Sequence, residues 1–203
     1  MSFDHKITDL KLHINKLVPK DVCEYFINVY EENKHLAATE QSYKFQSKKN
    51  EEDNFKCINL ITEASKDEKF IEPLEKAKRY ITIMLTNYVL HIKKHICPTF
   101  NDLHISNTDN IRILKYEKGQ LIKDHSDVGG SIRASCTLNL NEDYTGGEFR
   151  FFDGKIKHSF KTGDAMIFPA EPIWIHGTEP IKSGSRYSIN CFLQHKDIPR
   201  RCY

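Results

Sequence analysis

The spacing of apolar residues divides the chain into a helical first half and a β-rich second half. Apolar residues recur every three or four positions after Pro19, and again between about residue 69 and residue 95. This spacing predicts two amphipathic helices, and Pro73 suits the first turn of the second one. The residues that carry the two patterns are Val22, Phe26, Val29 and Tyr30 in the first, and Leu74, Ala77, Ile81, Leu85, Tyr88 and Ile92 in the second.

From Asn110 onward the pattern changes to short runs rich in β-branched and aromatic residues, most of them bounded by Gly, Asp or Pro. Such runs predict many short strands, arranged as a sandwich or barrel. The predicted helices would then pack on one face of the larger sheet. The predicted strands lie in the segments NIRILKYEKG, QLIKDHSD, SIRASCTLNL, GGEFRFF, KIKHSF, AMIFP, PIWIH and RYSINCFLQ.

The length of 203 residues fits one domain. We expect residues 1–203 to form a single α+β, mainly β domain, with a helical N-terminal elaboration over residues 1–109 and a β core over residues 110–195. Residues 37–56 are polar, rich in charge and without clear periodicity. They are interpreted either as a solvated loop or as a flap near an active site, and both interpretations stay open.

Composition and charge exclude several classes of protein. The chain has 30 Lys and Arg residues against 28 Asp and Glu residues, a balance that gives no reason to expect a polyanion-binding surface. No stretch reaches the roughly 18 apolar residues of a membrane span, and the first residues do not resemble an export signal. The six cysteines lack CxxC spacing, so we expect reduced, mostly buried thiols and a cytoplasmic protein.

Three residues have the side chains and the spacing of a metal centre. His125 and Asp127 are separated by one residue at the end of a predicted strand, so their side chains point to the same side. His176 follows at the end of another predicted strand. Two imidazoles and one carboxylate form a facial triad that leaves open positions on Fe(II), as oxygen activation requires.

A fourth residue predicts an anion site beside that metal. Arg186 follows His176 by ten residues, in the predicted strand RYSINCFLQ. Strand parity puts Arg186, Ser188 and Asn190 on one face of this strand. A guanidinium next to a hydroxyl is a suitable donor pair for a carboxylate, and the C5 carboxylate of 2-oxoglutarate fits it.

These residues lie within a longer series of motifs that resembles a known family. The ordered set YxxGxxxxxHxD, LN followed by GGExxF, GDAxxFP, HGxxP and GxRYS covers residues 110–195. It is similar to the Fe(II)/2-oxoglutarate dioxygenase family, and most similar to its prolyl 4-hydroxylase-like branch. The resemblance implies a double-stranded β-helix (jelly-roll, cupin-like) core. It also implies Fe(II), 2-oxoglutarate and O2 as cofactor and co-substrates, with ascorbate as a further candidate.

The same resemblance implies roles for individual residues. The iron ligands would be His125, Asp127 and His176, with no catalytic side chain beyond them. The residues expected to bind 2-oxoglutarate are Arg186, Ser188, Tyr116, Asn139 and Thr137. The residues expected to form the substrate wall are Trp174, Phe192 and Tyr43.

The substrate is the least determined part of this interpretation. A prolyl residue of a protein or peptide is expected from the resemblance, with succinate and CO2 as co-products. A free amino acid or another small molecule is an alternative. A nucleic-acid demethylase of the AlkB type is disfavoured, because Phe192 stands six residues after Arg186 where that type has a second arginine. A cupin-like metal-binding module without redox chemistry would not need the carboxylate site at Arg186. We expect no membrane partner, and the oligomeric state stays open.

Overall fold

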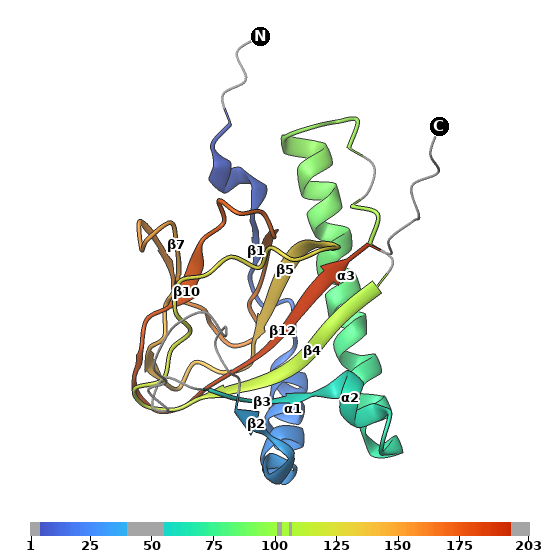
Figure 1. Cartoon of the computed structure of the whole chain (residues 1–203), viewed down its shortest axis with the longest axis vertical. Helices are drawn as coiled ribbons and strands as arrows, with labels where there is room; N and C mark the ends of the chain where they lie inside the picture. The colour runs from blue at the N-terminus through green and yellow to red at the C-terminus, as the bar shows by residue number, and fades with distance from the viewer. Residues whose placement is uncertain (1–4, 40–54, 101–102, 106, 196–203) are drawn as a thin grey trace.

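The computed structural model describes residues 5–39, 55–100, 103–105 and 107–195, which are built around one large antiparallel sheet (Figure 1). Its seven strands lie in the order β1-β9-β5-β12-β4-β3-β2, and two smaller sheets have the orders β10-β7-β8 and β11-β6. The strands are β1 (Leu12–Ile14), β2 (Ala38–Thr39), β3 (Lys56–Asn59), β4 (Asn107–Tyr116), β5 (Ile132–Asn139), β6 (Thr145–Gly146), β7 (Phe149–Phe151), β8 (Ile156–His158), β9 (Ala165–Pro169), β10 (His176–Thr178), β11 (Ile181–Ser183) and β12 (Arg186–Gln194).

Two of the helices cover one face of the seven-stranded sheet, as expected from the apolar pattern (Figure 1). The long helix α3 presents its apolar residues to the sheet, from Leu74 to Ile92. Its basic last turn, which ends at His95, interacts favourably with the helix dipole. The α-helices are α1 (Lys20–Glu32), α2 (Leu60–Ala64) and α3 (Ile71–His95), and the short 3-10 helices are η1 (Ile7–Leu10), η2 (Lys34–Leu36) and η4 (Glu68–Phe70).

The strand β12 lies in the middle of the large sheet, between β5 and β4. Side chains alternate across a strand, so every second residue of β12 faces the helices. These residues are buried in one apolar core with the helices and the neighbouring strands. They are Tyr187, Ile189, Cys191 and Leu193. The intervening residues therefore face away from the helices, toward the smaller sheets.

Two predicted strands differ from the structure. The segment QLIKDHSD contains no strand, only a single bridge between His125 and His176. In the segment PIWIH a turn forms instead, in which the Trp174 backbone N–H donates to the Glu171 carbonyl. His176 was expected at the end of a strand, but it is the first residue of β10. The apolar character of this segment reflects burial of Trp174 in an aromatic cluster, which a strand would also produce.

The N-terminal part contributes strands as well as helices, since β1, β2 and β3 all join the large sheet. Residues 40–54, which form most of the candidate flap, lie outside the described residues, and so does Tyr43. Within the described part of the chain, no helix has both the length and the apolar character needed to cross a bilayer.

Candidate active site

The two histidines of the predicted triad are brought together by their own backbones. His125 and His176 exchange two backbone hydrogen bonds, with N···O distances of 2.9 and 2.8 Å. Because β10 also pairs with β7, this bridge attaches the His125 loop to the edge of the three-stranded sheet. Convergence of the side chains therefore depends on this tertiary pairing, and not on a regular strand through His125 as expected.

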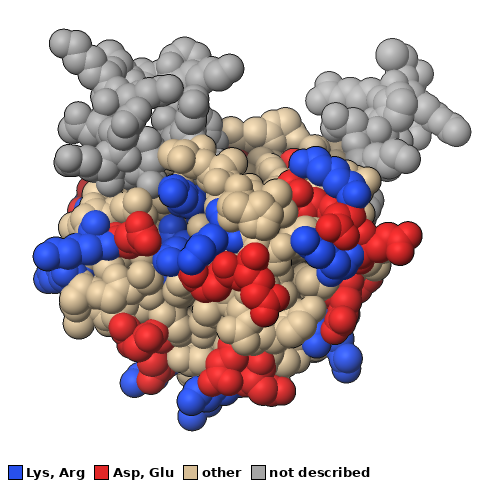
Figure 2. All heavy atoms as spheres, turned by 90° about the horizontal axis from the view of Figure 1, so that it is seen from below, with Lys and Arg blue, Asp and Glu red and all other residues tan. Residues whose placement is uncertain are grey.

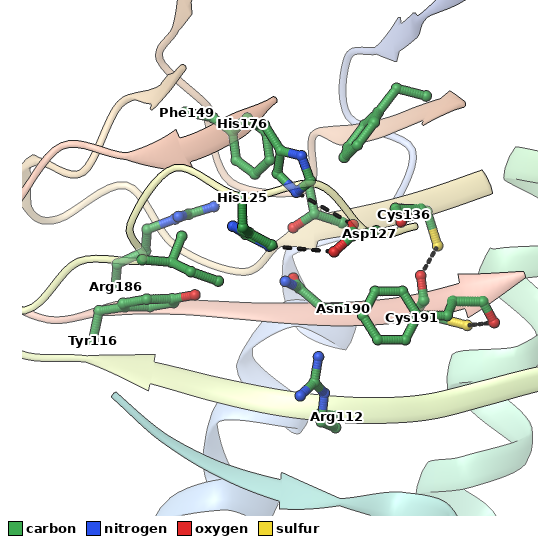
Figure 3. Close-up of a pocket in the computed structure, with 15 residues that line it drawn as sticks. Arg112, Tyr116, His125, Asp127, Cys136, Phe149, His176, Arg186, Asn190 and Cys191 are labelled. Atoms are coloured by element: carbon green, nitrogen blue, oxygen red, sulfur yellow. Dashed lines mark hydrogen bonds and ion pairs between the residues drawn. The ribbon is translucent and has the colours of Figure 1, made fainter. Parts of the chain in front are cut away.

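Asp127 lies beside both imidazoles, with one carboxylate oxygen directed at each (Figure 3). Its carboxylate oxygens are 3.2 Å from Nε2 of His125 and 3.2 Å from Nε2 of His176. The three candidate ligand atoms lie within 4.8 Å of one another, and no other such group of three is found among the described residues. Asp127 and His176 are 5% and 4% exposed, so the donors are held at the base of a pocket.

Hydrogen bonds to backbone carbonyls fix which nitrogen of each histidine is available to a metal. Nδ1 of His125 is 2.8 Å from the Lys123 carbonyl, and Nδ1 of His176 is 2.9 Å from the Trp174 carbonyl. A carbonyl oxygen can only accept, so Nδ1 carries the proton in both rings. In the neutral rings each Nε2 then presents its lone pair beside Asp127, whereas a ring protonated at Nε2 donates a hydrogen bond to that carboxylate. The neutral form is the arrangement that orients histidine ligands in metal sites, and the donor set suits Fe(II).

The electrostatics keep the carboxylate ionised. Burial alone would raise the pKa of Asp127, but the hydrogen bonds and charges of His125 and His176 outweigh it and hold that pKa well below its usual range. Burial would lower the pKa of His125, and the hydrogen bond and charge of Asp127 more than compensate, so this pKa is raised. An anionic ligand beside two imidazoles is what a divalent cation would bind.

Aromatic rings form the wall behind the metal ligands. Phe149 stacks on the His176 ring with a centroid distance of 5.4 Å and an interplanar angle of 11°. Phe168 meets the same ring edge-on at 4.7 Å. Trp174 packs behind them with 2% of its surface exposed, and it is not among the residues that line the pocket. Trp174 thus contacts the site through its carbonyl group and supports it through packing.

Arg186 reaches the same pocket, which has a volume of about 460 Å³ including its open mouth (Figure 3). The side chain is 2% exposed, and its guanidinium carbon lies 5.5 Å from the centre of the Tyr116 ring and 5.7 Å from that of Phe160. No carboxylate among the described residues forms an ion pair with it. A buried cation without a counter-ion is costly, so this end of the pocket is built for an anion.

Asn139 holds the arginine in place. Its side-chain oxygen accepts a hydrogen bond from Nε of Arg186 at 3.1 Å, which leaves the two terminal nitrogens of the guanidinium for a ligand. Its amide nitrogen donates to the carbonyls of Asn141 at 2.6 Å and Lys161 at 3.2 Å. Asn139 is 0% exposed and is not among the pocket-lining residues. It therefore positions Arg186, and a direct contact of Asn139 with a ligand stays a prediction.

Gly147 leaves room for the Ile181 side chain beside the same arginine. Its φ is +69°, a conformation that favours glycine. A Cβ atom there would approach the Ile181 side chain to 2.5 Å and Cδ of Arg186 to 3.6 Å. The GGE motif therefore has a packing role at the anion site.

The other expected ligand-binding residues have different surroundings. Tyr116, Thr137 and Phe192 line the pocket. Ser188 is buried but is not among the lining residues, and its hydroxyl lies 3.5 Å from Oδ1 of Asn190. Their roles in binding stay predictions.

Several pocket residues were not assigned a role from the sequence. The most polar of them are Arg112, Ser135 and Asn190. Strand parity contained the signal for Arg112, because it lies four residues before Tyr116 in β4 and so on the same face. Phe149 and Phe168 could not be assigned in this way, because their contact with His176 joins segments that are distant in sequence.

Comparisons with known proteins agree with the motifs. The sequence profile of the 2OG-Fe(II) oxygenase superfamily matches residues 111–194. A putative prolyl 4-hydroxylase of Acanthamoeba polyphaga mimivirus is 23% identical over an alignment of 127 positions that covers 52% of each chain. The chain spans about half the length of the curated relatives that it matches.

Solved structures agree with the expected fold. A prolyl hydroxylase of Trichoplax adhaerens, in complex with a peptide fragment of the hypoxia inducible factor oxygen degradation domain, superimposes with a TM-score of 0.67 at 14% identity, over 92% of this chain and 84% of that one. A Pseudomonas putida prolyl-4-hydroxylase gives 0.63 at 16% identity, over 94% and 97%. The double-stranded β-helix fold expected from the sequence is confirmed, and so is the resemblance to the superfamily.

Proposed function

We propose that this chain, whose residues 111–194 match the profile of the 2OG-Fe(II) oxygenase superfamily, is an Fe(II)- and 2-oxoglutarate-dependent hydroxylase that releases succinate and CO2. One observation carries the proposal. The buried Arg186 guanidinium, without a counter-ion among the described residues, opens into the same pocket as the donor cluster of His125, Asp127 and His176. An anion site and a metal site in one pocket fit a ligand that is a carboxylate at one end and a chelator at the other.

Each residue of the pocket has a defined task in this mechanism. His125, Asp127 and His176 would hold Fe(II) through Nε2 atoms and a carboxylate that the protein keeps ionised. Arg186, oriented by Asn139, would bind the C5 carboxylate of 2-oxoglutarate. The aromatic wall at Phe149 and Phe168 would exclude water from one side of the metal ligands. When bound, Fe(II) supplies the oxygen chemistry that couples decarboxylation of 2-oxoglutarate to hydroxylation of the substrate.

A prolyl residue of a protein or peptide is the first candidate substrate. This finer assignment rests on similarity to proteins named as prolyl hydroxylases, one of them solved with a peptide. A free amino acid is the second candidate substrate, because the polar side chains of Arg112, Ser135 and Asn190 also line the pocket.

Two other functions fit the described residues less well. A nucleic-acid substrate would be expected to need a basic surface. On the face seen in Figure 2, Lys and Arg side chains are interspersed with Asp and Glu side chains. A metal-binding module without redox chemistry would leave Arg186 as a buried cation without purpose.

The proposal is tested by assaying succinate formation by the full chain with Fe(II), 2-oxoglutarate and ascorbate, and then omitting each in turn. Mass spectrometry of proline-containing peptides and of free proline would detect the gain of one oxygen atom. Replacing Arg186 with Ala removes the charged hydrogen bonds to the co-substrate, and should raise KM for 2-oxoglutarate by about tenfold to a hundredfold.

The matched control is Arg79→Ala, because Arg79 is an exposed arginine on α3. It should leave KM for 2-oxoglutarate unchanged. Succinate formation that continues without Fe(II), or an Arg186→Ala variant with the wild-type KM, would overturn the proposal.

A further inference from the structure

The pocket has a second polar region at the end opposite Arg186. Arg112 of β4, Ser135 of β5 and Asn190 of β12 all line the pocket. Asn190 is paired directly with Arg112, and the next position of β12 on the same face is paired with Ser135. We call these three residues the far end of the pocket. In Figure 3 the Arg112 guanidinium extends from β4 toward Asn190, which lies between Arg112 and Asp127.

The far end and Arg186 lie at different positions along the same two strands. Arg186 is paired with Tyr116, and Asn190 with Arg112, so the two ends are four residues apart on both strands. Four residues of extended chain separate the backbones of the two ends by about 13 Å. A five-carbon diacid that is bound to Arg186 by one carboxylate and to the metal by the other end has no charged group left for the far end. The far end is therefore left for a second ligand, which has the metal donors between it and the co-substrate.

The far end also contains a polar group that the fold leaves unsatisfied. Ser135 is 4% exposed, and its hydroxyl is buried without a hydrogen-bond partner among the residues that the structure describes. Burial of an unsatisfied hydroxyl costs free energy that a bound acceptor would recover. The neighbouring Thr137 hydroxyl is in the same state, toward the middle of the pocket.

The chemistry of the three side chains selects the ligand. Arg112 offers a planar set of N–H donors, Asn190 an amide and Ser135 a hydroxyl. Together they form a donor-rich site with a positive charge, which matches a carboxylate better than a neutral amide. The Phe192 ring lies beneath the Arg112 guanidinium, 5.4 Å from its central carbon, and supports the plane of that group.

We propose that the far end of the pocket binds a carboxylate of the primary substrate, close to the carbon that is hydroxylated. This inference rests on the proposed hydroxylase function and names the substrate class for the same site. The carboxylate has two possible sources. It is either the α-carboxylate of a free amino acid such as proline, or the side chain of an acidic residue next to the target residue in a peptide.

The test is anaerobic isothermal titration of the full chain loaded with Fe(II) and 2-oxoglutarate, so that binding is measured without turnover. Two matched probe pairs distinguish the sources. The first pair is L-proline and L-prolinamide. The second is a capped proline peptide with Asp beside the proline, and the same peptide with Asn. In one pair, we expect the carboxylate member to bind at least about tenfold more tightly than the amide.

Arg112→Gln should reduce that preference to less than about threefold, and Arg112→Lys should restore part of it, since it keeps the charge but loses the planar donors. Ser135→Ala should weaken the carboxylate probe about threefold to tenfold, because it removes one donor. The exposed Arg79→Gln is the control for loss of a positive charge, and should leave the preference intact.

Two results would overturn the inference. One is a wild-type protein that does not discriminate in either pair. The other is an Arg112→Gln variant that stays folded by circular dichroism and keeps the full preference. Failure of the proposed function gives a different result. The wild-type protein would then form no succinate in air with any probe, whatever the anaerobic titrations give.

Discussion

The two faces of β12 have opposite chemistry, although they alternate residue by residue along one strand. On the helix face, Ile189, Cys191 and Leu193 are at most 1% exposed and pack into the core with α3 and the neighbouring strands. On the pocket face, Arg186 and Asn190 line a cavity of about 460 Å³.

The two faces also differ in how completely their groups are satisfied. The helix face is close-packed and mostly apolar, so its energy comes from burial. The pocket face buries the Arg186 guanidinium without a counter-ion among the described residues, and the neighbouring strand β5 adds the Ser135 and Thr137 hydroxyls, which lack hydrogen-bond partners among the same residues. The comparison indicates that the helix face stabilises the sheet, while the pocket face gives up stability to keep polar groups available for ligands.

The largest effect is expected on the pocket face, at the metal ligands. Asp127→Asn keeps the size of the side chain but removes the charge that two histidines share. Loss of a residue that hydrogen-bonds to a metal ligand costs about tenfold to a hundredfold in metal affinity. Loss of a ligand itself should therefore reduce succinate formation by more than about a hundredfold.

Iron content after gel filtration should fall in parallel with activity. Asp153→Asn is the control, because Asp153 is exposed and at a positive φ that asparagine tolerates. An Asp127→Asn protein that binds iron and forms succinate normally would contradict the assignment of the pocket face.

The next largest effect is expected when neighbouring residues on the two faces of β12 are replaced. Ile189→Ala should lower the free energy of unfolding by about 2–5 kcal/mol, because it leaves a cavity in the core. The folded fraction should bind 2-oxoglutarate with unchanged affinity. Ser188→Ala, one residue away on the other face, should cost less than about 1.5 kcal/mol, because the one hydrogen bond that its hydroxyl makes with the described residues is long.

Urea unfolding followed by circular dichroism measures both variants. The contrast between the faces would fail if Ile189→Ala cost no more than Ser188→Ala. It would also fail if Ile189→Ala changed the affinity for 2-oxoglutarate.

Sequence periodicity predicted the elements that are buried on one side along their whole length. The helix α3 is an example, because its apolar residues from Leu74 to Ile92 face one core. Parity along β12 likewise placed Arg186 and Asn190 on the same face. The motif resemblance named the three residues that the structure brings within 4.8 Å of one another. Local order along the chain was sufficient for these features.

Features that depend on pairing between distant segments could not be predicted in the same way. His125 and His176 meet through an isolated bridge, and a strand pattern cannot specify such a bridge. Asn139 positions Arg186 because β5 pairs with β12, so that Asn139 lies opposite Ser188. Trp174 is as buried as a strand residue would be, but it belongs to a turn held by an aromatic cluster. Burial alone did not distinguish the two.

A smaller effect should follow from loosening Arg186 without removing it. Asn139→Ala deletes the acceptor of the Nε hydrogen bond and the donors to Asn141 and Lys161. A hydrogen bond to a charged group is worth about 1.5–3 kcal/mol, so KM for 2-oxoglutarate should rise about tenfold or more.

Affinity for iron should stay near the wild-type value, because Asn139 does not touch the metal ligands. An exposed asparagine on α3 supplies the control as Asn87→Ala. If Asn139→Ala lowered iron affinity and left KM unchanged, Asn139 would not act through Arg186.

The smallest effect on stability is expected at a polar cluster on the helix face, formed by Glu31, Lys115 and Tyr187. Glu31 of α1 accepts hydrogen bonds from Lys115 of β4 and from the Tyr187 hydroxyl of β12. These two bonds lower the pKa of the Glu31 carboxyl in the folded protein, and the bond from Lys115 has the larger effect. The stabilisation is therefore fully present above the unfolded-state pKa, and it is lost as the pH falls through the lower folded-state value.

Glu31→Gln should lower the free energy of unfolding at pH 7 by less than about 1 kcal/mol, because the side chain is 34% exposed. The difference from the wild-type protein should shrink as the pH is lowered from about 4.5 toward 3, since protonation then removes the same charge from the wild type. Ile189→Ala is the matched comparison, because its cost comes from lost packing and should not depend on pH in this range. A Glu31→Gln difference that stays constant from pH 7 to pH 3 would mean that charge at Glu31 does not stabilise the helix face, and that packing alone separates it from the pocket face.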